Sequence, residues 1–423
     1  MPPVVRDTCN IIEQGILPTH GPADRSTTRY LRPSPYCTLH LPVNEMEIGE
    51  RRIALFTGAY DHIADGVSLT LNRLVRHLLD RGAAVRVFAP AGEAPAIDHS
   101  GDLITVPSIA APGRPEYRIS TGIGRAASRE LTAFKPNLFH VATPDLLGLR
   151  ALRLASSSRT PLVSSYHTHF ASYLQYYRLG ALQGFTWRYL RWFYSRCRQV
   201  YVPTQSMLNL LADHGVRTEM KIWPRGVDST RFNPARRSME WRQSVGIEHD
   251  EVVVLFVSRL VMEKGLDVLG DVLAQLSQRG VRHRALIVGD GPERGNLEHR
   301  LPNAIFTGTL GGDELATAYA SSELFFFPSE TETFGNVTLE ALASGLPAVV
   351  ANATGSKELV EEGRTGYLAS ARDTSTLASR VEELIQDTSA RRRFSAAATA
   401  AAQRYEWPRV LDKLVSYYAE LPS

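Results

Sequence analysis

One stretch of the chain decides its fold: Leu324-Phe-Phe-Phe-Pro328-Ser-Glu-Thr-Glu332-Thr-Phe-Gly-Asn336-Val-Thr-Leu-Glu340-Ala-Leu-Ala-Ser-Gly345. Its first four residues are apolar and predict a buried strand that stops at Pro328. A polar loop follows, and the apolar spacing then predicts a helix that begins near Asn336 and ends at Gly345. A strand, a loop and a helix N-terminus in this order direct backbone N–H groups at one point, which predicts an anion site suited to a diphosphate.

Two carboxylates flank this predicted anion site. Glu332 lies in the loop and Glu340 about one turn into the helix. One carboxylate can reach the group attached to one end of a bound diphosphate, and the other carboxylate can reach the group attached to the other end. Carboxylates accept hydrogen bonds from sugar hydroxyls, so these two groups can be a transferred sugar and a ribose. The competing interpretation is an ordinary helix with acidic residues near its start, which the helix dipole favours.

Similar units repeat on both sides of this stretch, because short β-rich runs alternate with helical patterns. We predict an α/β protein with two Rossmann-like domains, whose parallel sheets face each other across a cleft. The segment Trp223–Asp228 carries turn formers and predicts the linker. The expected organisation is an extension at 1–50, an acceptor domain at 51–224, a donor domain at 225–405 and a helix at 406–423 that returns toward the first domain.

Composition narrows the class of protein further. A chain of 423 residues with 43% hydrophobic residues can bury two cores. Its net charge of +3 is too small to imply nucleic acid, and we expect no nucleic-acid partner. The three cysteines fit a reducing compartment, and neither a signal peptide nor a spanning run is apparent. These features predict a cytoplasmic location.

A second loop carries cations where open α/β sheets bind ligands. Arg259 and Lys264 follow the predicted strand at 252–257, where together they can offset the charge of a departing diphosphate. Alone, such residues would more often be solvated surface charges. After the next strand, Gly289-Asp290-Gly291-Pro292 permits close backbone approach and the start of a helix.

Two features of the first predicted domain lie at strand ends. Gly58 and Gly66 bound the loop after the first strand, eight residues apart, and this spacing is not the dinucleotide fingerprint. His167 begins His-Thr-His after the strand at 162–165. Two interpretations of His167 remain open. It can be a structural histidine at the end of a strand, or it can bind a metal ion together with His169, although no third and fourth ligand of suitable spacing is nearby.

These residues together resemble the retaining glycosyltransferase family 4, which has the GT-B fold. The Glu-x7-Glu pair, the flanking Thr-Phe-Gly-Asn and the following Ala-Ser-Gly-Leu-Pro carry the resemblance, which covers residues 51 to about 410. Together with His-Thr-His at 167–169, the sequence Thr331-Glu-Thr-Phe-Gly-Asn-Val337 is most similar to that of the branch of mannosyl- and other hexosyltransferases that use lipid acceptors.

The resemblance implies a role for each matching residue. It implies that Glu332 binds the donor sugar and that Glu340 binds the nucleoside ribose. It also implies that Arg259 and Lys264 bind the diphosphate. His167 would line the sugar site and help catalysis. The remaining donor-binding residues that it implies are Gly66, Gly289, Phe334, Gly335, Asn336 and Val337.

The implied activity is retaining transfer of a hexose from a GDP- or UDP-linked sugar to an acceptor hydroxyl, most simply that of a membrane lipid. We expect no cofactor and no metal ion, because the two cations supply the positive charge. A soluble or polysaccharide acceptor is the alternative within the class. A nucleotide-sugar epimerase and a non-catalytic sugar-nucleotide-binding protein are alternatives outside it.

A basic aromatic segment suggests where the acceptor lies. Residues 170–198 contain ten aromatic residues and five arginines and no acidic residue. If 185–198 is helical, one side carries Phe185, Tyr189, Trp192 and Phe193, and another carries Arg188, Arg191 and Arg198. Such a helix predicts peripheral docking on anionic lipid. The alternative is that the aromatic residues pack into the core and the arginines are solvated.

Overall fold

The computed structural model describes residues 46–92, 94–111, 114–167 and 183–422. Most of the expected N-terminal extension, together with Thr168, His169 and the first part of the basic aromatic segment, lies outside these residues. The described chain begins with a 3-10 turn, η1 (Ile48–Glu50), and then forms two parallel sheets in succession. The prediction of two Rossmann-like α/β domains is therefore confirmed.

The first sheet has seven parallel strands. Their spatial order is β3 (Asp102–Thr105), β2 (Ala84–Ala89), β1 (Arg52–Phe56), β6 (Leu138–Val141), β7 (Leu162–Ser165), β8 (Gln199–Val202) and β9 (Glu219–Ile222). An antiparallel hairpin, β4 (Ser108–Ala111) and β5 (Arg114–Ser120), follows β3. The helices are α1 (Gly66–Asp80), α2 (Arg125–Phe134), α3 (Leu146–Ser158), α5 (Gln183–Tyr194) and α6 (Gln205–Asp213).

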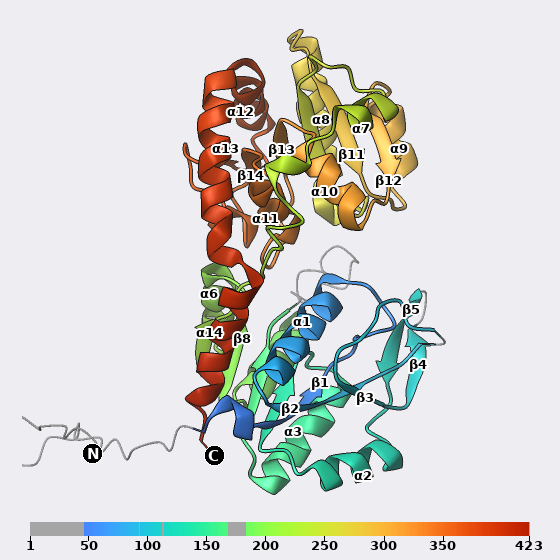
Figure 1. The fold of residues 1–423 in the computed structure, drawn as a ribbon, viewed down its shortest axis with the longest axis vertical. Helices are drawn as coiled ribbons and strands as arrows, with labels where there is room; N and C mark the ends of the chain where they lie inside the picture. The colour runs from blue at the N-terminus through green and yellow to red at the C-terminus, as the bar shows by residue number, and fades with distance from the viewer. Residues whose placement is uncertain (1–45, 93, 112–113, 168–182, 423) are drawn as a thin grey trace, which may run out of the picture. The chain divides into compact units, whose positions relative to one another are not determined.

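Both faces of this sheet are covered, as its buried strands require. Successive side chains of a strand point to opposite faces, so Ile53 and Leu55 pack with α1 while Ala54 and Phe56 pack with α2 and α3. Figure 1 shows α1 on one face and α2 and α3 on the other.

The second sheet has six parallel strands. Their order is β12 (Ile305–Gly308), β11 (Arg284–Val288), β10 (Val253–Val257), β13 (Leu324–Phe327), β14 (Ala348–Ala351) and β15 (Gly366–Ala369). Its helices are α7 (Met239–Ser244), α8 (Leu266–Gln278), α9 (Arg294–Arg300), α10 (Gly312–Ala320), α11 (Asn336–Ala343), α12 (Thr374–Gln386) and α13 (Thr388–Ala402). Short 3-10 turns lie between them, namely η3 (Pro234–Arg236), η4 (Met262–Lys264), η5 (Ser356–Glu358) and η6 (Gln403–Tyr405).

The last helix, α14 (Trp407–Ala419), packs in the core of the first sheet rather than the second. Leu414 and Tyr418 are fully buried there among residues of α1 and β1. Arg51, itself buried, donates to the carbonyl oxygens of Tyr418 at 2.8 Å and Leu421 at 2.6 Å. A cation is favourable at a helix C-terminus, so this contact fastens the end of the chain to the beginning of β1.

Candidate functional site

The strand order of the second sheet reverses between β10 and β13, next to the predicted site loops. β10 pairs on one side with β11, its successor along the chain, and on the other with β13. Loops that leave neighbouring strands in opposite directions form the usual ligand crevice of such sheets. A side-chain carbon at Gly265, after β10, would lie 2.9 Å from the carbonyl oxygen of Pro328, after β13. The two predicted site loops therefore lie side by side.

A short ion pair joins those loops. Lys264 Nζ lies 2.5 Å from Glu332 Oε1, and the two side chains are only 12% and 16% exposed. The hydroxyl of Ser329 donates to the same carboxylate oxygen at 3.2 Å. Glu332 is thus held in place by two contacts, and part of the Lys264 charge is already compensated.

Arg259 differs from Lys264 although both belong to one loop. Its side chain is exposed, and within the described residues it forms no ion pair. Arginine can bind a phosphate with two parallel hydrogen bonds. Arg259 is therefore available to an anionic ligand without first breaking another ion pair.

The N-terminus of α11 is also available to an anion. Its N-cap is Gly335, with a φ of 101°, and no described side chain accepts a hydrogen bond there. By contrast, Asp65 caps α1 by accepting from the N–H groups of Val67 at 3.0 Å and Ser68 at 2.8 Å. First-turn N–H groups without a cap form an anion site with the positive end of the helix dipole.

Gly66 and Gly335, two of the three predicted glycine positions, are crowded. A side-chain carbon at Gly66, the first residue of α1, would lie 3.0 Å from Asn336 Nδ2, and one at Gly335 would lie 2.5 Å from Ser356 Oγ. Both glycines therefore allow a close approach that a larger residue would obstruct. At Gly66 the obstructing atom is the end of a flexible side chain, so the limit is softer there.

Glu340 is the second predicted carboxylate, on the inward side of α11. It retains a little exposed surface, but enough protein surrounds it that burial raises its pKa to about 7, opposed by the Tyr319 hydroxyl and the Arg73 charge. Tyr319 donates to Oε2 at 3.1 Å. Glu340 is thus a carboxylate of reduced acidity that gains from any further hydrogen-bond donor, such as a ribose hydroxyl.

His167 lies two residues beyond the end of β7 and is 6% exposed. Its Nδ1 lies 2.5 Å from a terminal guanidinium nitrogen of Arg225, which is also buried. Burial, the Arg225 charge and His140 hold the His167 pKa well below its usual value. The hydroxyl of Thr333 donates to the carbonyl oxygen of His167 at 3.2 Å, which connects the Glu332 loop to this residue.

Two of the predicted donor-binding residues pack against the core, and a third, Gly289, is confined by its backbone surroundings. Phe334 is 3% exposed and its ring packs edge-on against Tyr405. Val337 packs against the same core. Gly289 has a φ of 131°, and a side-chain carbon there would lie 1.8 Å from the Ser258 carbonyl oxygen. The Phe334 and Val337 side chains pack against the core, and at Gly289 only the backbone is present to meet a ligand.

The predicted aromatic face of the basic segment is wrong in detail. The helix α5 ends at Tyr194, so Arg198 lies beyond it. Phe193 is fully buried, whereas Phe185 is 63% and Trp192 39% exposed. The arginines stand beside these exposed rings: Arg188 over Phe185 at 5.3 Å and Arg196 over Trp192 at 4.3 Å. The exposed group, which we call the α5 patch, comprises Phe185, Arg188, Arg191, Trp192 and Arg196.

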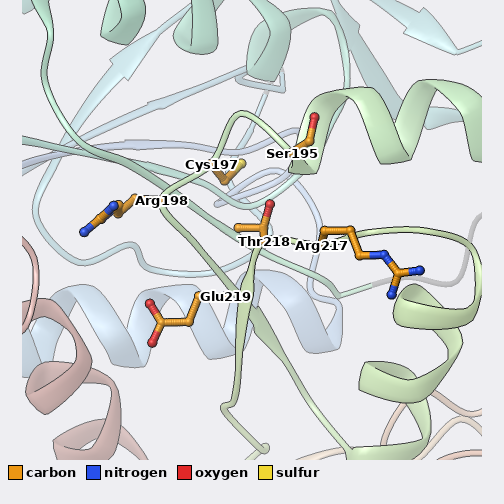
Figure 2. A pocket seen from close by; sticks show the side chains of 6 residues that line it. All are labelled: Ser195, Cys197, Arg198, Arg217, Thr218 and Glu219. Atoms are coloured by element: carbon orange, nitrogen blue, oxygen red, sulfur yellow. The ribbon is translucent and has the colours of Figure 1, made fainter. Parts of the chain in front are cut away.

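A separate depression lies at the opposite edge of the first sheet, where β8 and β9 begin. Figure 2 shows its lining, with the side chains of Arg198 and Arg217 pointing away from each other. Guanidinium groups that diverge cannot grip one anion together. The depression is lined by Ser195, Cys197, Arg198, Arg217, Thr218 and Glu219.

Sequence reasoning missed Arg225 and Arg73. Arg225 stands in the segment taken for a linker, and its partner His167 is 58 positions away. Arg73 lies on α1, close enough to Glu340 to oppose the rise in that carboxyl's pKa. No local pattern marks either residue, because each is defined by a contact between distant segments.

Two parallel Rossmann-like sheets with this pair of carboxylates, two cations and an uncapped helix N-terminus define a glycosyltransferase of the GT-B class. The chain belongs to glycosyltransferase family 4: a model described as "Glycosyltransferase Family 4" matches residues 64–231, and one described as "Glycosyl transferases group 1" matches 238–401. The alternatives outside the glycosyltransferases are thereby set aside.

Several characterised proteins are similar over most of the chain. A GDP-mannose-dependent alpha-mannosyltransferase of Corynebacterium glutamicum is 33% identical over 88% of this chain and 89% of its own. The sulfoquinovosyl transferase SQD2 of Arabidopsis thaliana is 32% identical over 86% and 72%. Among solved structures, a sucrose-phosphate synthase of Thermosynechococcus elongatus has a TM-score of 0.74 at 20% identity, covering 87% of this chain and 98% of its own.

Within the residues that the structure describes, no helix is both long and apolar enough to cross a bilayer.

Proposed function

We propose that this glycosyltransferase moves a hexose from a nucleoside diphosphate sugar to a hydroxyl of a membrane lipid, with retention of the anomeric configuration. GDP-mannose is the first donor to test. The contact that carries the proposal is the Lys264–Glu332 pair at 2.5 Å, next to exposed Arg259 and the uncapped α11. This arrangement offers cations to a diphosphate and a fixed carboxylate to a sugar.

Similar proteins support the choice of donor and acceptor. Relatives from Corynebacterium glutamicum and Mycolicibacterium smegmatis, each 33% identical, are named GDP-mannose-dependent alpha-mannosyltransferases. A relative from Streptococcus pneumoniae, 27% identical over 70% of this chain, is named alpha-monoglucosyldiacylglycerol synthase. The α5 patch adds a physical reason, since exposed aromatic rings beside arginines suit the headgroup region of an anionic membrane.

The proposed reaction needs no strong protein base. The bond from the anomeric carbon to the phosphate oxygen breaks, the acceptor oxygen bonds to the same face, and the acceptor proton passes to the departing phosphate oxygen. Arg259, Lys264 and the α11 N–H groups would stabilise the charge that builds on the diphosphate. Glu332 would hold the sugar, and Glu340 the ribose. We propose that no metal ion is required, because these groups already supply positive charge.

Donor binding comes first in the test. Saturation-transfer NMR of the full chain against GDP- and UDP-sugars should select one donor, and Glu340→Ala should weaken that binding. Glu330→Gln, a change at an exposed carboxylate of the same loop, is the control and should leave binding unchanged. Failure to bind any of the donors would remove the basis of the proposal.

Transfer is then measured with radiolabelled donor and anionic vesicles with or without diacylglycerol. We expect organic-extractable product, an anomeric configuration equal to that of the donor by NMR, and undiminished turnover in EDTA. Product that stays in the aqueous phase with added sugars would refute the lipid acceptor but not the transferase. An inverted product, or loss of turnover in EDTA, would refute the proposed mechanism.

A further inference from the structure

The two ring nitrogens of His167 have different surroundings. Nδ1 contacts the Arg225 guanidinium at 2.5 Å. Nε2 is buried as well, but among the described residues it has no hydrogen-bond partner. A buried polar atom without a partner costs about 1–3 kcal/mol, so it demands a physical explanation.

The direction of the Arg225 hydrogen bond can be assigned from chemistry alone. A guanidinium only donates and does not lose its proton under ordinary conditions, so Nδ1 must be the acceptor. A neutral imidazole that accepts at one nitrogen carries its proton on the other. The proton of His167 therefore resides on Nε2, where no described residue accepts a hydrogen bond from it.

We propose that Arg225 is a positioning residue for the transfer reaction, which fixes His167 as a neutral Nε2–H donor for an oxygen of the bound substrates. The inference rests on the proposed function, since a substrate oxygen would be the partner that Nε2 lacks among the described residues. His167 in this state donates a hydrogen bond and neither accepts nor releases a proton during turnover.

The groups that face His167 agree on its charge. Arg225 approaches His167 from the linker, and His140 approaches it from β6. Both ring nitrogens of His140 already form hydrogen bonds, one with the Tyr418 hydroxyl and one with the Ser165 hydroxyl. Thr333 reaches only the His167 backbone, and the Trp223 ring packs edge-on at 5.9 Å. Burial first, then Arg225 and His140, keep the pKa of His167 well below its usual value. The ring is therefore uncharged at neutral pH.

A purely structural role for Arg225 explains less. Its guanidinium also lies over the Trp223 ring at 5.4 Å, which could account for its burial. That contact gives no reason why His167 Nε2 has no partner among the described residues. Burial leaves the pKa of Arg225 at about 10, so the residue keeps its charge at neutral pH and continues to donate.

The direct test is nitrogen-15 NMR of the histidine rings in the full chain, with His167→Phe identifying the resonances. We expect the proton on Nε2 in the wild type and no titration between pH 6 and 8. Arg225→Met should release this restraint, giving mixed tautomers, whereas Arg225→Lys, which can still donate, should keep Nε2–H. A wild-type ring protonated at Nδ1, or doubly protonated, overturns the inference.

Kinetics separate positioning from structural support. Arg225→Met should lower kcat by about 10- to 100-fold with little change in KM for donor, and Arg225→Lys should recover most of it. In a His167→Phe background the same change should have no further effect, as expected of residues that act as a unit. Equal losses in both backgrounds overturn the inference. The control is Arg217→Met, a change at an exposed arginine near the beginning of β8 and β9, which should leave kcat unchanged.

The two proposals can fail separately. If the wild type transfers no sugar, the proposed function fails, while the ring spectra still decide which nitrogen carries the proton. If transfer occurs but the spectra show Nδ1–H, only the inference about Arg225 fails.

Discussion

Replacing Glu340 by glutamine should stabilise the protein at pH 8 and weaken donor binding at the same time. Burial raises the pKa of Glu340 to about 7 from an ordinary 4.5. A carboxyl with a raised folded-state pKa binds its proton more tightly when folded, so this stability is present below pH 4.5 and is lost as pH rises to 7. Above pH 7 the folded protein carries a carboxylate that its surroundings disfavour.

The size of the effect follows from the shift. A difference of about 2.5 between the two pKa values corresponds to a ceiling of about 3.5 kcal/mol, since each unit is worth about 1.4 kcal/mol. Glutamine is neutral at every pH and its side-chain oxygen can still accept from Tyr319. We therefore expect Glu340→Gln to raise Tm by about 5 °C at pH 8 and by much less at pH 5.

The assay is thermal unfolding of wild type, Glu340→Gln and the control Glu330→Gln from pH 5 to 8.5, without ligand. The Tm difference for Glu340→Gln should grow across the window from 4.5 to 7, while that for Glu330→Gln stays flat. A Glu340→Gln difference that is independent of pH, or a variant less stable than wild type at pH 8, would refute the reasoning. Donor affinity of the wild type should rise between pH 6 and 8, because ribose hydroxyls favour the ionised carboxylate.

Three further predictions concern the loops and the α5 patch. Arg259→Ala and Lys264→Ala should each lower turnover by about 10²–10³ with folding intact, measured by steady-state kinetics and circular dichroism. Gly289→Ala should cost about 2–4 kcal/mol in denaturant unfolding, because its φ and the nearby Ser258 carbonyl both oppose a side chain, whereas Gly295→Ala, in open space on α9, should not destabilise. Sedimentation with anionic vesicles should weaken as salt rises, and Trp192→Ala should reduce it about tenfold; no binding at low salt would contradict the membrane assignment.

The sequence indicates most clearly those strands whose residues are buried on both faces. The apolar runs of β1, β10, β13 and β14 stand out because a central parallel strand has no solvent-facing side. The strands β3 and β9 were not predicted, since they lie at the edges of the first sheet and their residues are partly exposed. The β4–β5 hairpin was missed for a similar reason, since the described β4 residues are partly or fully exposed.

Sequence likewise predicts one part of the candidate site and not the other. Residues that occupy the end of a strand or the start of a helix, such as Glu332, Arg259 and His167, can be placed by sequence because their position depends on local structure. Contacts between distant segments cannot: Lys264 and Glu332 are 68 positions apart, and no sequence pattern pairs them. Sequence also cannot predict that Phe193 is buried while Phe185 and Trp192 on the same helix are exposed, because the burial of Phe193 depends on the sheet beneath the helix.

The compensation of Lys264 by Glu332 makes the two cations of the site unequal. Exposed Arg259 can meet a diphosphate in the ground state without giving up an ion pair, so its contribution should be largest for binding. Lys264 must share its charge with Glu332 until more negative charge develops on the leaving group, and only then does its interaction strengthen. An interaction that grows in the transition state raises kcat, whereas one already present in the bound donor lowers KM. The losses in the two alanine variants should accordingly differ in kind, with a KM component for Arg259 and a nearly pure kcat loss for Lys264.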